Sequence, residues 1–246
     1  MAAPNPANND LRIEVITDGA DFEPAHACIG KCFGDQTSDG IWILMSPGWD
    51  TPEGNKRLAA RLRDRWQETQ QNNNTIFLKA TLPDPDAQGA RRIVGVAIWV
   101  NASKIPGEGE VPGEVDYAAL YPEDEGKQRF LKQAMASLHK QRYQVLEEKA
   151  RPESKQKSIM VLDLCVTDPA YQRRGIARRL VQWGLDEAKR RGDLEATTEG
   201  SAMGRHVYRQ LGFQGVSDIV WEVDDEFKNY SLPPNLFMRT RPSDAL

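Results

Sequence analysis

Residues 161–191 read V-L-D-L-C-V-T-D-P-A-Y-Q-R-R-G-I-A-R-R-L-V-Q-W-G-L-D-E-A-K-R-R, and this stretch predicts a strand, a short loop and an amphipathic helix. Residues 159–166 are almost continuously apolar and end at an Asp-Pro turn signal, which is typical of a strand buried on both faces. From Gly175 onward the apolar residues recur at helical spacing. Gly192 follows three basic residues, and this order predicts the C-terminal end of the helix.

The loop before this helix has the features of an anion-binding site. A helix N-terminus carries unpaired backbone N–H groups, a glycine lets the chain approach a phosphate, and two arginines add charged donors. The pattern is neither a Walker loop nor the Rossmann fingerprint, because their glycine and lysine spacings are absent. Either the loop is a diphosphate cradle or it is a solvated basic helix start. The residues concerned are Gln172, Arg173, Arg174, Gly175, Ile176 and Ala177.

A second motif, H-V-Y-R-Q-L-G-F at residues 206–213, follows in the order found in one known family. With L-C-V-T-D-P-A-Y-Q-R-R-G-I-A at residues 164–177, it resembles the GNAT superfamily of N-acetyltransferases, over residues 159–213. In that family the loop holds the pyrophosphate of acetyl-CoA and the preceding strand binds the pantetheine. The tyrosine of the later helix protonates the leaving thiolate.

The resemblance therefore implies site roles for particular residues. Tyr208 is the expected acid, with packing beneath the cofactor as the alternative. Ala177 stands where many relatives have glycine, and Ser201 stands where relatives often have an asparagine that contacts the cofactor. The residues expected to bind acetyl-CoA are Leu164, Cys165, Val166, the six loop residues 172–177, and Ser201.

The same resemblance implies an α/β fold, with a twisted mixed β-sheet flanked by helices on both faces. The implied function is an acetyl-CoA-dependent N-acetyltransferase, in which the amine of a small molecule attacks the thioester directly. Two alternatives stay open. One is a non-catalytic acyl-CoA-binding or interaction domain, and the other is an O-acetyltransferase.

The sequence does not identify the general base. Several relatives place a carboxylate at the position of Leu162, and Asp163 is adjacent to it. Asp163 acts through water or binds a cationic substrate, or else it forms an ion pair with a basic neighbour, because a carboxylate in an apolar strand is costly unless paired. Glu199 and Asp116 are further candidates. His206 is expected on the surface, since it lies two residues from the tyrosine and hence on another helical face.

Composition excludes several other classes of function. The net charge of −4 gives no indication of a nucleic-acid partner. No apolar run approaches the roughly 20 residues of a membrane span. Three cysteines fit a reducing, cytoplasmic compartment. Cys28 and Cys32 lack a second pair that would complete a metal site, so no metal is expected and they are interpreted as core thiols. The oligomeric state is not indicated.

We expect a flexible N-terminal tail at residues 1–10 and a single domain at residues 11–241. The Pro- and Gly-rich, acidic segment 102–157 is interpreted as an insertion. It either selects the acceptor, through Glu114 and Asp116, or is a solvated acidic loop.

Two further patterns concern the core and its surroundings. Residues 34–54 are irregular and contain Trp42 and Trp49, which either shape a substrate pocket or cover the core. In the expected strand at residues 91–101, alternation places Val94 on the same face as Val96 and Ile98.

Overall fold

The computed structural model describes residues 10–113 and 115–241. The expected tail, apart from Asp10, and Glu114 in the acidic segment lie outside the described residues. The structure therefore does not test the expectations for either of them.

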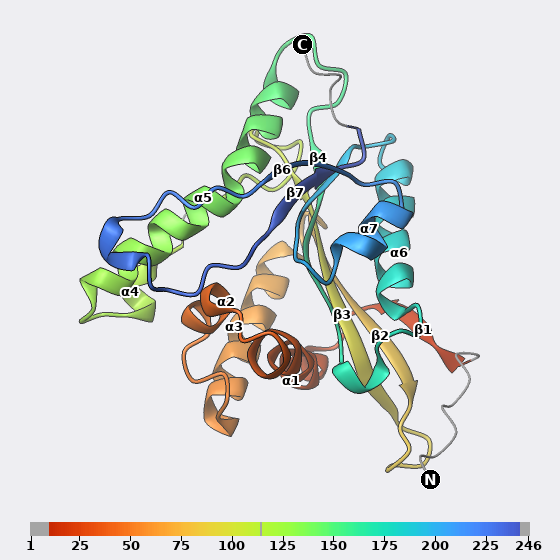
Figure 1. Cartoon of the computed structure of the whole chain (residues 1–246). Coiled ribbons are helices and arrows are strands. Elements are labelled where there is room, and N and C mark those ends of the chain that lie inside the picture. Colours follow the sequence, from red (N-terminus) through yellow and green to blue (C-terminus); the bar gives the residue numbers. More distant parts are fainter. Residues whose placement is uncertain (1–9, 114, 242–246) are drawn as a thin grey trace.

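Seven strands form one open mixed sheet in the order β1-β2-β3-β4-β5-β7-β6 (Figure 1). Neighbouring strands are antiparallel except β4 and β5, which run parallel and are joined by α6. The strands are β1 (Arg12–Val15), β2 (Thr75–Pro83), β3 (Arg91–Ala102), β4 (Ile159–Thr167), β5 (Ala196–Gly200), β6 (Gln214–Asp218) and β7 (Leu236–Arg239).

Helices cover both faces of this sheet, as the sequence predicted. One face packs against α1, α3 and α5, and the other against α6 and α7. Within the described residues, no helix combines the length and the apolar character needed to cross a membrane. The helices are α1 (Phe22–Gly30), α2 (Gly40–Met45), α3 (Pro52–Thr69), α4 (Tyr117–Leu120), α5 (Glu125–Ala150), α6 (Ile176–Arg190) and α7 (Arg205–Gln210), with short turns η2 (Gly19–Asp21), η3 (Lys31–Gln36, π-helical), η4 (Pro169–Tyr171) and η5 (Asp225–Phe227).

One face assignment from the sequence is wrong. Val94 packs in the core beneath α6, whereas Ile93 packs with Val96 and Ile98 in the core on the other face. The cause is a β-bulge beside Thr81, in which Val94 is the extra residue of β3. An inserted residue reverses the alternation on one side of it, and the apolar pattern does not show where this happens.

The parallel strands β4 and β5 separate after only two paired positions. Met160 pairs with Ala196 and Val161 pairs with Thr197. Beyond them Oγ1 of Thr198 in β5 still donates to the carbonyl of Leu162 at 3.0 Å, after which β4 continues without a paired residue of β5. Residues 163–167 therefore present a strand edge to a gap in the sheet, and this gap is where the site lies.

The segment expected as an insertion contains α4 and the long helix α5. Val145 and Leu146, near the C-terminal end of α5, belong to the core of the sheet. Phe130 and Leu131, near its N-terminal end, form a separate cluster with Phe227. The chain between β6 and β7 runs along α5 (Figure 1), and it covers the part of the helix that projects beyond the sheet.

We predict that Gly184→Ala is strongly destabilising, because α6 lies directly on Trp99 at this glycine. A Cβ at position 184 would lie 1.9 Å from the indole ring. The expected loss in the free energy of unfolding is about 1–3 kcal/mol, as for other overpacked cores, measured by urea unfolding. Gln182→Ala, at an exposed position of the same helix, should change it by less than about 0.5 kcal/mol. Similar losses in both variants would contradict this account.

Candidate active site

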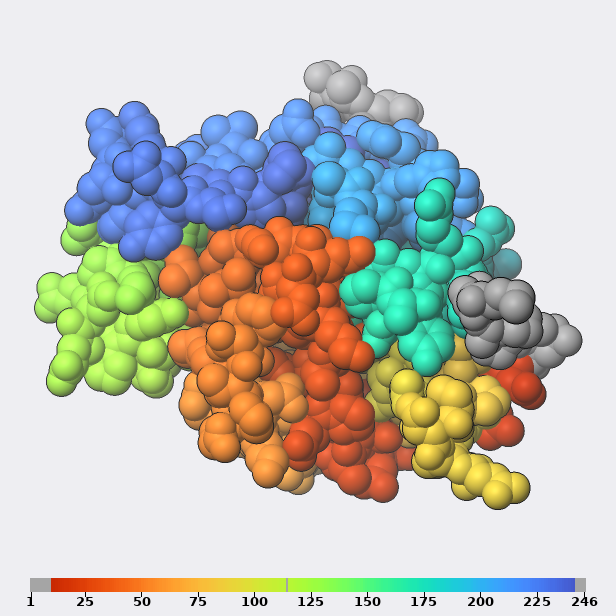
Figure 2. Space-filling view, turned by 60° about the horizontal axis from the view of Figure 1, so that its bottom comes forward, coloured from red at the N-terminus to blue at the C-terminus, as the bar shows by residue number. Residues whose placement is uncertain are grey.

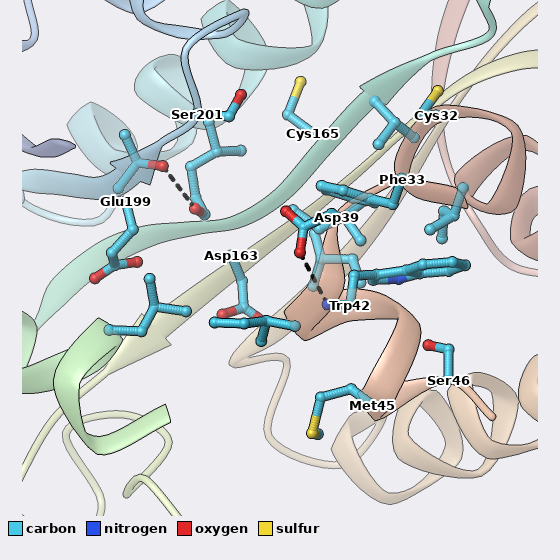
Figure 3. A pocket seen from close by; sticks show the side chains of 18 of the residues that line it. Cys32, Phe33, Asp39, Trp42, Met45, Ser46, Asp163, Cys165, Glu199 and Ser201 are labelled. Carbon is cyan, nitrogen blue, oxygen red and sulfur yellow. Dashed lines mark hydrogen bonds between the residues drawn. The ribbon is translucent and has the colours of Figure 1, made fainter. Parts of the chain in front are cut away.

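A cavity of about 2180 Å³ opens where β4 and β5 separate. Parts of η3, α2, α3, α5, α7 and the start of α6 line it together with the two strands. In the space-filling view the N-terminal helices, red to orange, lie between green residues near α4 and teal residues around position 175 (Figure 2). Figure 3 shows β4 crossing the cavity, with Asp163 and Cys165 on the strand.

The loop at the start of α6 has an unusual backbone. Arg173 has φ of 63° and Gly175, the N-cap residue, has φ of 76°. Successive residues of alternating hand turn their N–H groups into a concave, anion-binding arrangement, and the helix dipole adds positive potential there. A Cβ at Gly175 would meet no atom within 4 Å, so the space in front of the loop is open. The loop can therefore receive a diphosphate.

Two sets of contacts tie this loop region to η3, which also lines the cavity. Gln172 and Gln36 exchange side-chain hydrogen bonds of 2.8 and 3.0 Å. Nζ of Lys31 lies 2.8 Å from the carboxylate of Asp168, at the end of β4. Gln172 also donates to the carbonyl of Thr167 at 3.0 Å. The loop is thus anchored to the strand before it and to the N-terminal part of the chain.

The cavity brings together all but one of the residues expected to hold acetyl-CoA. The exception is Arg174, whose guanidinium lies 5.1 Å over the ring of Tyr171. Arg178 lines the cavity although the sequence analysis did not single it out, and its position one turn after Gly175 was the available signal. The expected residues that line the cavity are Leu164, Cys165, Val166, Gln172, Arg173, Gly175, Ile176, Ala177 and Ser201.

Tyr208 lies on α7 at the same cavity and is only 7% exposed. Its ring packs on Phe213, with centroids 5.9 Å apart, and approaches Gly204 so closely that a Cβ there would lie 2.6 Å from it. Burial, with a smaller effect of Cys165, raises the pKa of Tyr208 well above its ordinary value. Its hydroxyl has no hydrogen-bond partner in the described part of the chain. The cavity therefore contains a buried, protonated phenol.

A network of charged side chains spans the gap between β4 and β5. Arg142 of α5 donates to Asp163 of β4 at 3.1 Å and binds both carboxylate oxygens of Glu199 of β5, one of them at 3.1 Å. Arg65 of α3 donates at 3.2 Å to the other oxygen of Asp163 and lies 3.6 Å from Glu110. The network joins two helices to two diverging strands.

Asp163 is the extra residue of a second β-bulge, because its two neighbours in β4 pair with successive residues of β3. Burial alone would raise the pKa of Asp163, but the positive charges of Arg65 and Arg142 outweigh burial and hold it well below its ordinary range. Of the interpretations that the sequence left open, the ion pair is the one present in the structure. A carboxylate with both oxygens bound by arginines is poorly suited to accept a proton.

His139 lies on α5 one turn before Arg142 and lines the cavity, although the sequence analysis missed it. Its half-buried ring meets Tyr143 edge-on, with centroids 6.0 Å apart. Burial, and then the charge of Arg142, lower the pKa of His139 to about 4, against the opposite effect of Glu199 and Asp163. The imidazole is therefore neutral near pH 7. Its helical spacing relative to the apolar stripe of α5 was the signal that could have found it.

Aromatic side chains of η3 and α2 form another wall of the cavity. Phe33 and Trp42 stack with centroids 5.7 Å apart and line the cavity together with Met45 (Figure 3). The rings of Trp49 and Trp42 meet edge to face, with their centroids 5.6 Å apart. Trp49 also fills the space over Gly34, where a Cβ would lie 2.2 Å from the Trp49 ring. Trp42 therefore lines the cavity, and Trp49 packs behind it.

The three cysteines are free thiols. Cys28 and Cys32 are buried, and Sγ of Cys32 donates to the carbonyl of Thr167 at 3.1 Å. Burial raises the pKa of Cys165 to about 12, so this residue of β4 is also protonated. Among residues 10–113 and 115–241, no three His, Cys, Asp or Glu side chains are grouped so that they could hold a metal ion.

The family model for the acetyltransferase (GNAT) family matches residues 133–213. This match begins inside α5, so the second half of the segment expected as an insertion lies within it. The matched residues include the loop at the start of α6 and Tyr208. Over these residues the chain is therefore similar to the GNAT family of acetyltransferases. No curated protein sequence matches it significantly.

Solved structures share the fold over nearly the whole chain at low sequence identity. Arylalkylamine N-acetyltransferase 2 from Aedes aegypti is 18% identical, with a TM-score of 0.58 and coverage of 94% of this chain and 98% of that one. A mosquito protein described as arylalkylamine N-acetyltransferase like 5b is 17% identical, with a TM-score of 0.58 and coverage of 93% and 98%. A Corynebacterium glutamicum protein, described as histone acetyltransferase HPA2 and related acetyltransferase, is 18% identical, with a TM-score of 0.53 and coverage of 95% and 97%.

We predict that Arg142→Met lowers the free energy of unfolding by about 3 kcal/mol at pH 7. The change leaves Glu199 without its partner in the cavity wall, and removing one member of a buried ion pair costs about 3–5 kcal/mol. The lower end applies because Asp163 is 24% exposed and keeps Arg65. Chemical denaturation at several pH values is the measurement. Lys104→Met, which breaks an exposed pair with Glu147, should have little effect.

The pH dependence has a defined direction. The folded-state pKa of Asp163 lies below its unfolded value of about 3.9, so its contribution to stability is complete above that value and is lost as the pH falls through the folded-state pKa. The difference in the free energy of unfolding between the parent and Arg142→Met should thus be largest at pH 7 and should decrease as the pH falls below about 4. A difference independent of pH would show that the arginine acts through packing alone.

Proposed function

We propose that this protein is an acetyl-CoA-dependent N-acetyltransferase that transfers the acetyl group to the amine of a small molecule. The observation that carries the proposal is a single cavity that combines the anion-binding loop, the free edge of β4 and the buried phenol of Tyr208. The match of residues 133–213 to the GNAT family model supports it, as does a fold shared with two proteins described as arylalkylamine N-acetyltransferases. The free cysteines favour a cytoplasmic location.

The residues present fit acetyl-CoA as the donor substrate. Arg173 and Arg178 supply positive charge beside the loop, and the open space at Gly175 lets a diphosphate approach the backbone. The edge of β4 between Leu162 and Thr167, whose carbonyls already accept side-chain hydrogen bonds, offers amide groups to the pantetheine arm. Ser201 accepts a hydrogen bond of 3.2 Å from a backbone N–H, which leaves its own proton for one bond to the donor.

In the proposed reaction the amine nitrogen bonds to the thioester carbonyl carbon, and the carbon–sulfur bond then breaks. A backbone N–H of β4 near Val166 holds the oxyanion. Tyr208 gives its proton to the departing sulfur and regains one from solvent. Burial raises the pKa of the phenol, and the same dry environment raises the pKa of the departing thiol. The two pKa values therefore stay close enough for the proton to move from the phenol to the sulfur.

Turnover tests the proposal directly. The protein would be incubated with acetyl-CoA and a panel of amines, amino acids, polyamines, peptides and alcohols, and thiol release would be followed. Thiol release with an amide product supports the proposal. Binding of acetyl-CoA without turnover would indicate the non-catalytic alternative, and an ester product would indicate an O-acetyltransferase.

Gly175→Glu should weaken acetyl-CoA binding strongly, because it places bulk and negative charge in front of the loop that receives the diphosphate. Calorimetry measures the affinity. Gly192→Glu is a matched control, since Gly192 also has positive φ (103°) and open space, but it lies after the other end of α6. Both variants carry similar backbone strain and the same charge change. Equal affinities in the two folded variants would show that the loop is not the diphosphate site.

Tyr208→Phe should slow acetyl transfer by about 10²–10⁴-fold, because it removes one hydroxyl and little packing volume. Single-turnover measurement avoids masking by product release, and the affinity for acetyl-CoA should change far less than the rate. Tyr230→Phe, in the cluster at the other end of α5, is the matched control and should transfer normally. A Tyr208→Phe protein that transfers within about threefold of the parent would remove this residue from the mechanism.

A further inference from the structure

The proposed reaction requires a group that takes a proton from the acceptor nitrogen, and several carboxylates line the cavity besides His139. Asp39, whose pKa is raised by burial, caps α2 by accepting a hydrogen bond of 2.9 Å from the backbone N–H of Trp42. Asp163 has one oxygen bound by Arg142 and the other by Arg65. Glu199 has both oxygens bound by Arg142 and its side chain is only 5% exposed. Both carboxylates are thus committed to the network that joins β4 to β5, and neither is available to exchange protons with a substrate.

His139 differs from these neighbours in its contacts. It lines the same cavity from α5, and its ring packs edge-on against Tyr143. Within the described residues, neither ring nitrogen has a hydrogen-bond or ion-pair partner. A half-buried imidazole with uncommitted nitrogens, one turn before the arginine that bridges the strands, is positioned to bond with something that enters the cavity.

We propose that His139 is the catalytic base that accepts the proton of the acceptor amine, an inference that rests on the proposed function. As the nitrogen bonds to the carbonyl carbon it becomes positively charged and strongly acidic, so one N–H proton moves to a ring nitrogen of His139. The carbon–sulfur bond breaks, and the electron pair leaves with the sulfur, which takes the proton of Tyr208. The imidazolium then releases its proton to solvent through the cavity mouth.

A neutral imidazole suits this step better than a free carboxylate. Only an unprotonated amine attacks a thioester, and a free carboxylate in contact would stabilise the unreactive ammonium form. The arginines neutralise Asp163 and Glu199, while burial and Arg142 keep His139 uncharged. The wall therefore does not favour the ammonium form of the acceptor.

The same surroundings support the charge that develops later. The groups facing His139 are Arg142 of its own helix, Asp163 of β4 and Glu199 of β5. The two carboxylates favour an imidazolium, whereas Arg142 and burial oppose it. The imidazolium is consequently tolerated during the reaction and does not persist, since its proton is lost again at neutral pH.

The test is single-turnover acetyl transfer from acetyl-CoA to 2-phenylethylamine, a probe chosen because Phe33 and Trp42 line the acceptor side. His139→Gln keeps a polar side chain of similar size that cannot take up a proton, and it should slow transfer by about 10²-fold or more. Acetyl-CoA affinity, measured by calorimetry, should be unchanged. The control is Lys140→Gln, because Lys140 is the next residue of α5, has a side chain 52% exposed and is not among the residues that line the cavity; it should transfer at the parent rate.

His139→Ala adds a readout that a structural role would not give. Added imidazole should restore transfer in proportion to its concentration, and less basic imidazole analogues should restore it less. His139 variants that transfer at the parent rate, or a slow alanine variant that imidazole does not rescue, would overturn this inference alone. A parent protein that binds acetyl-CoA but transfers acetyl to no amine would instead overturn the proposed function.

Discussion

The separation of β4 from β5 is the constraint on which the site depends. Two adjacent parallel strands normally satisfy each other's backbone groups, yet here they share only two paired positions. The free edge of β4 is the surface on which a donor can bond, and the gap is where an acceptor can reach it. Arg142 holds the separated strands at a fixed distance, since one guanidinium binds a carboxylate on each. A charged bridge thus replaces a ladder of amide bonds.

Backbone groups form one end of the cavity, and side chains form the other. At the donor end, backbone groups and a helix N-terminus do most of the binding, so the requirements on side chains are few. At the acceptor end the walls are side chains from η3, α2 and α5. The family match at residues 133–213 contains the donor end, whereas η3 and α2 lie outside it. This division fits a common donor combined with an acceptor particular to this protein.

Local apolar periodicity and a glycine at the helix end predicted the strand–loop–helix at the centre of the fold, whereas the mixed sheet with helices on both faces was implied by the resemblance to the GNAT superfamily. The sequence did not predict the bulges at Val94 and Asp163, since one extra residue in a strand leaves no mark on composition. It also missed His139. Its spacing from the apolar stripe of α5 indicates the face of the helix on which it lies, but not that Asp163 of β4 and Glu199 of β5 face it there.

The amide pair between Gln36 and Gln172, with the ion pair between Lys31 and Asp168, has a thermodynamic consequence. These contacts couple the position of η3 to that of the loop at the start of α6. Phe33, which lines the cavity, lies on η3. Ordering of the loop by the first ligand lowers the entropy that the wall must lose when the second ligand binds. Linkage is reciprocal, so each ligand must tighten the other by the same factor. The two ligands of the proposed reaction can thus bind cooperatively in this protein without any visible change of shape.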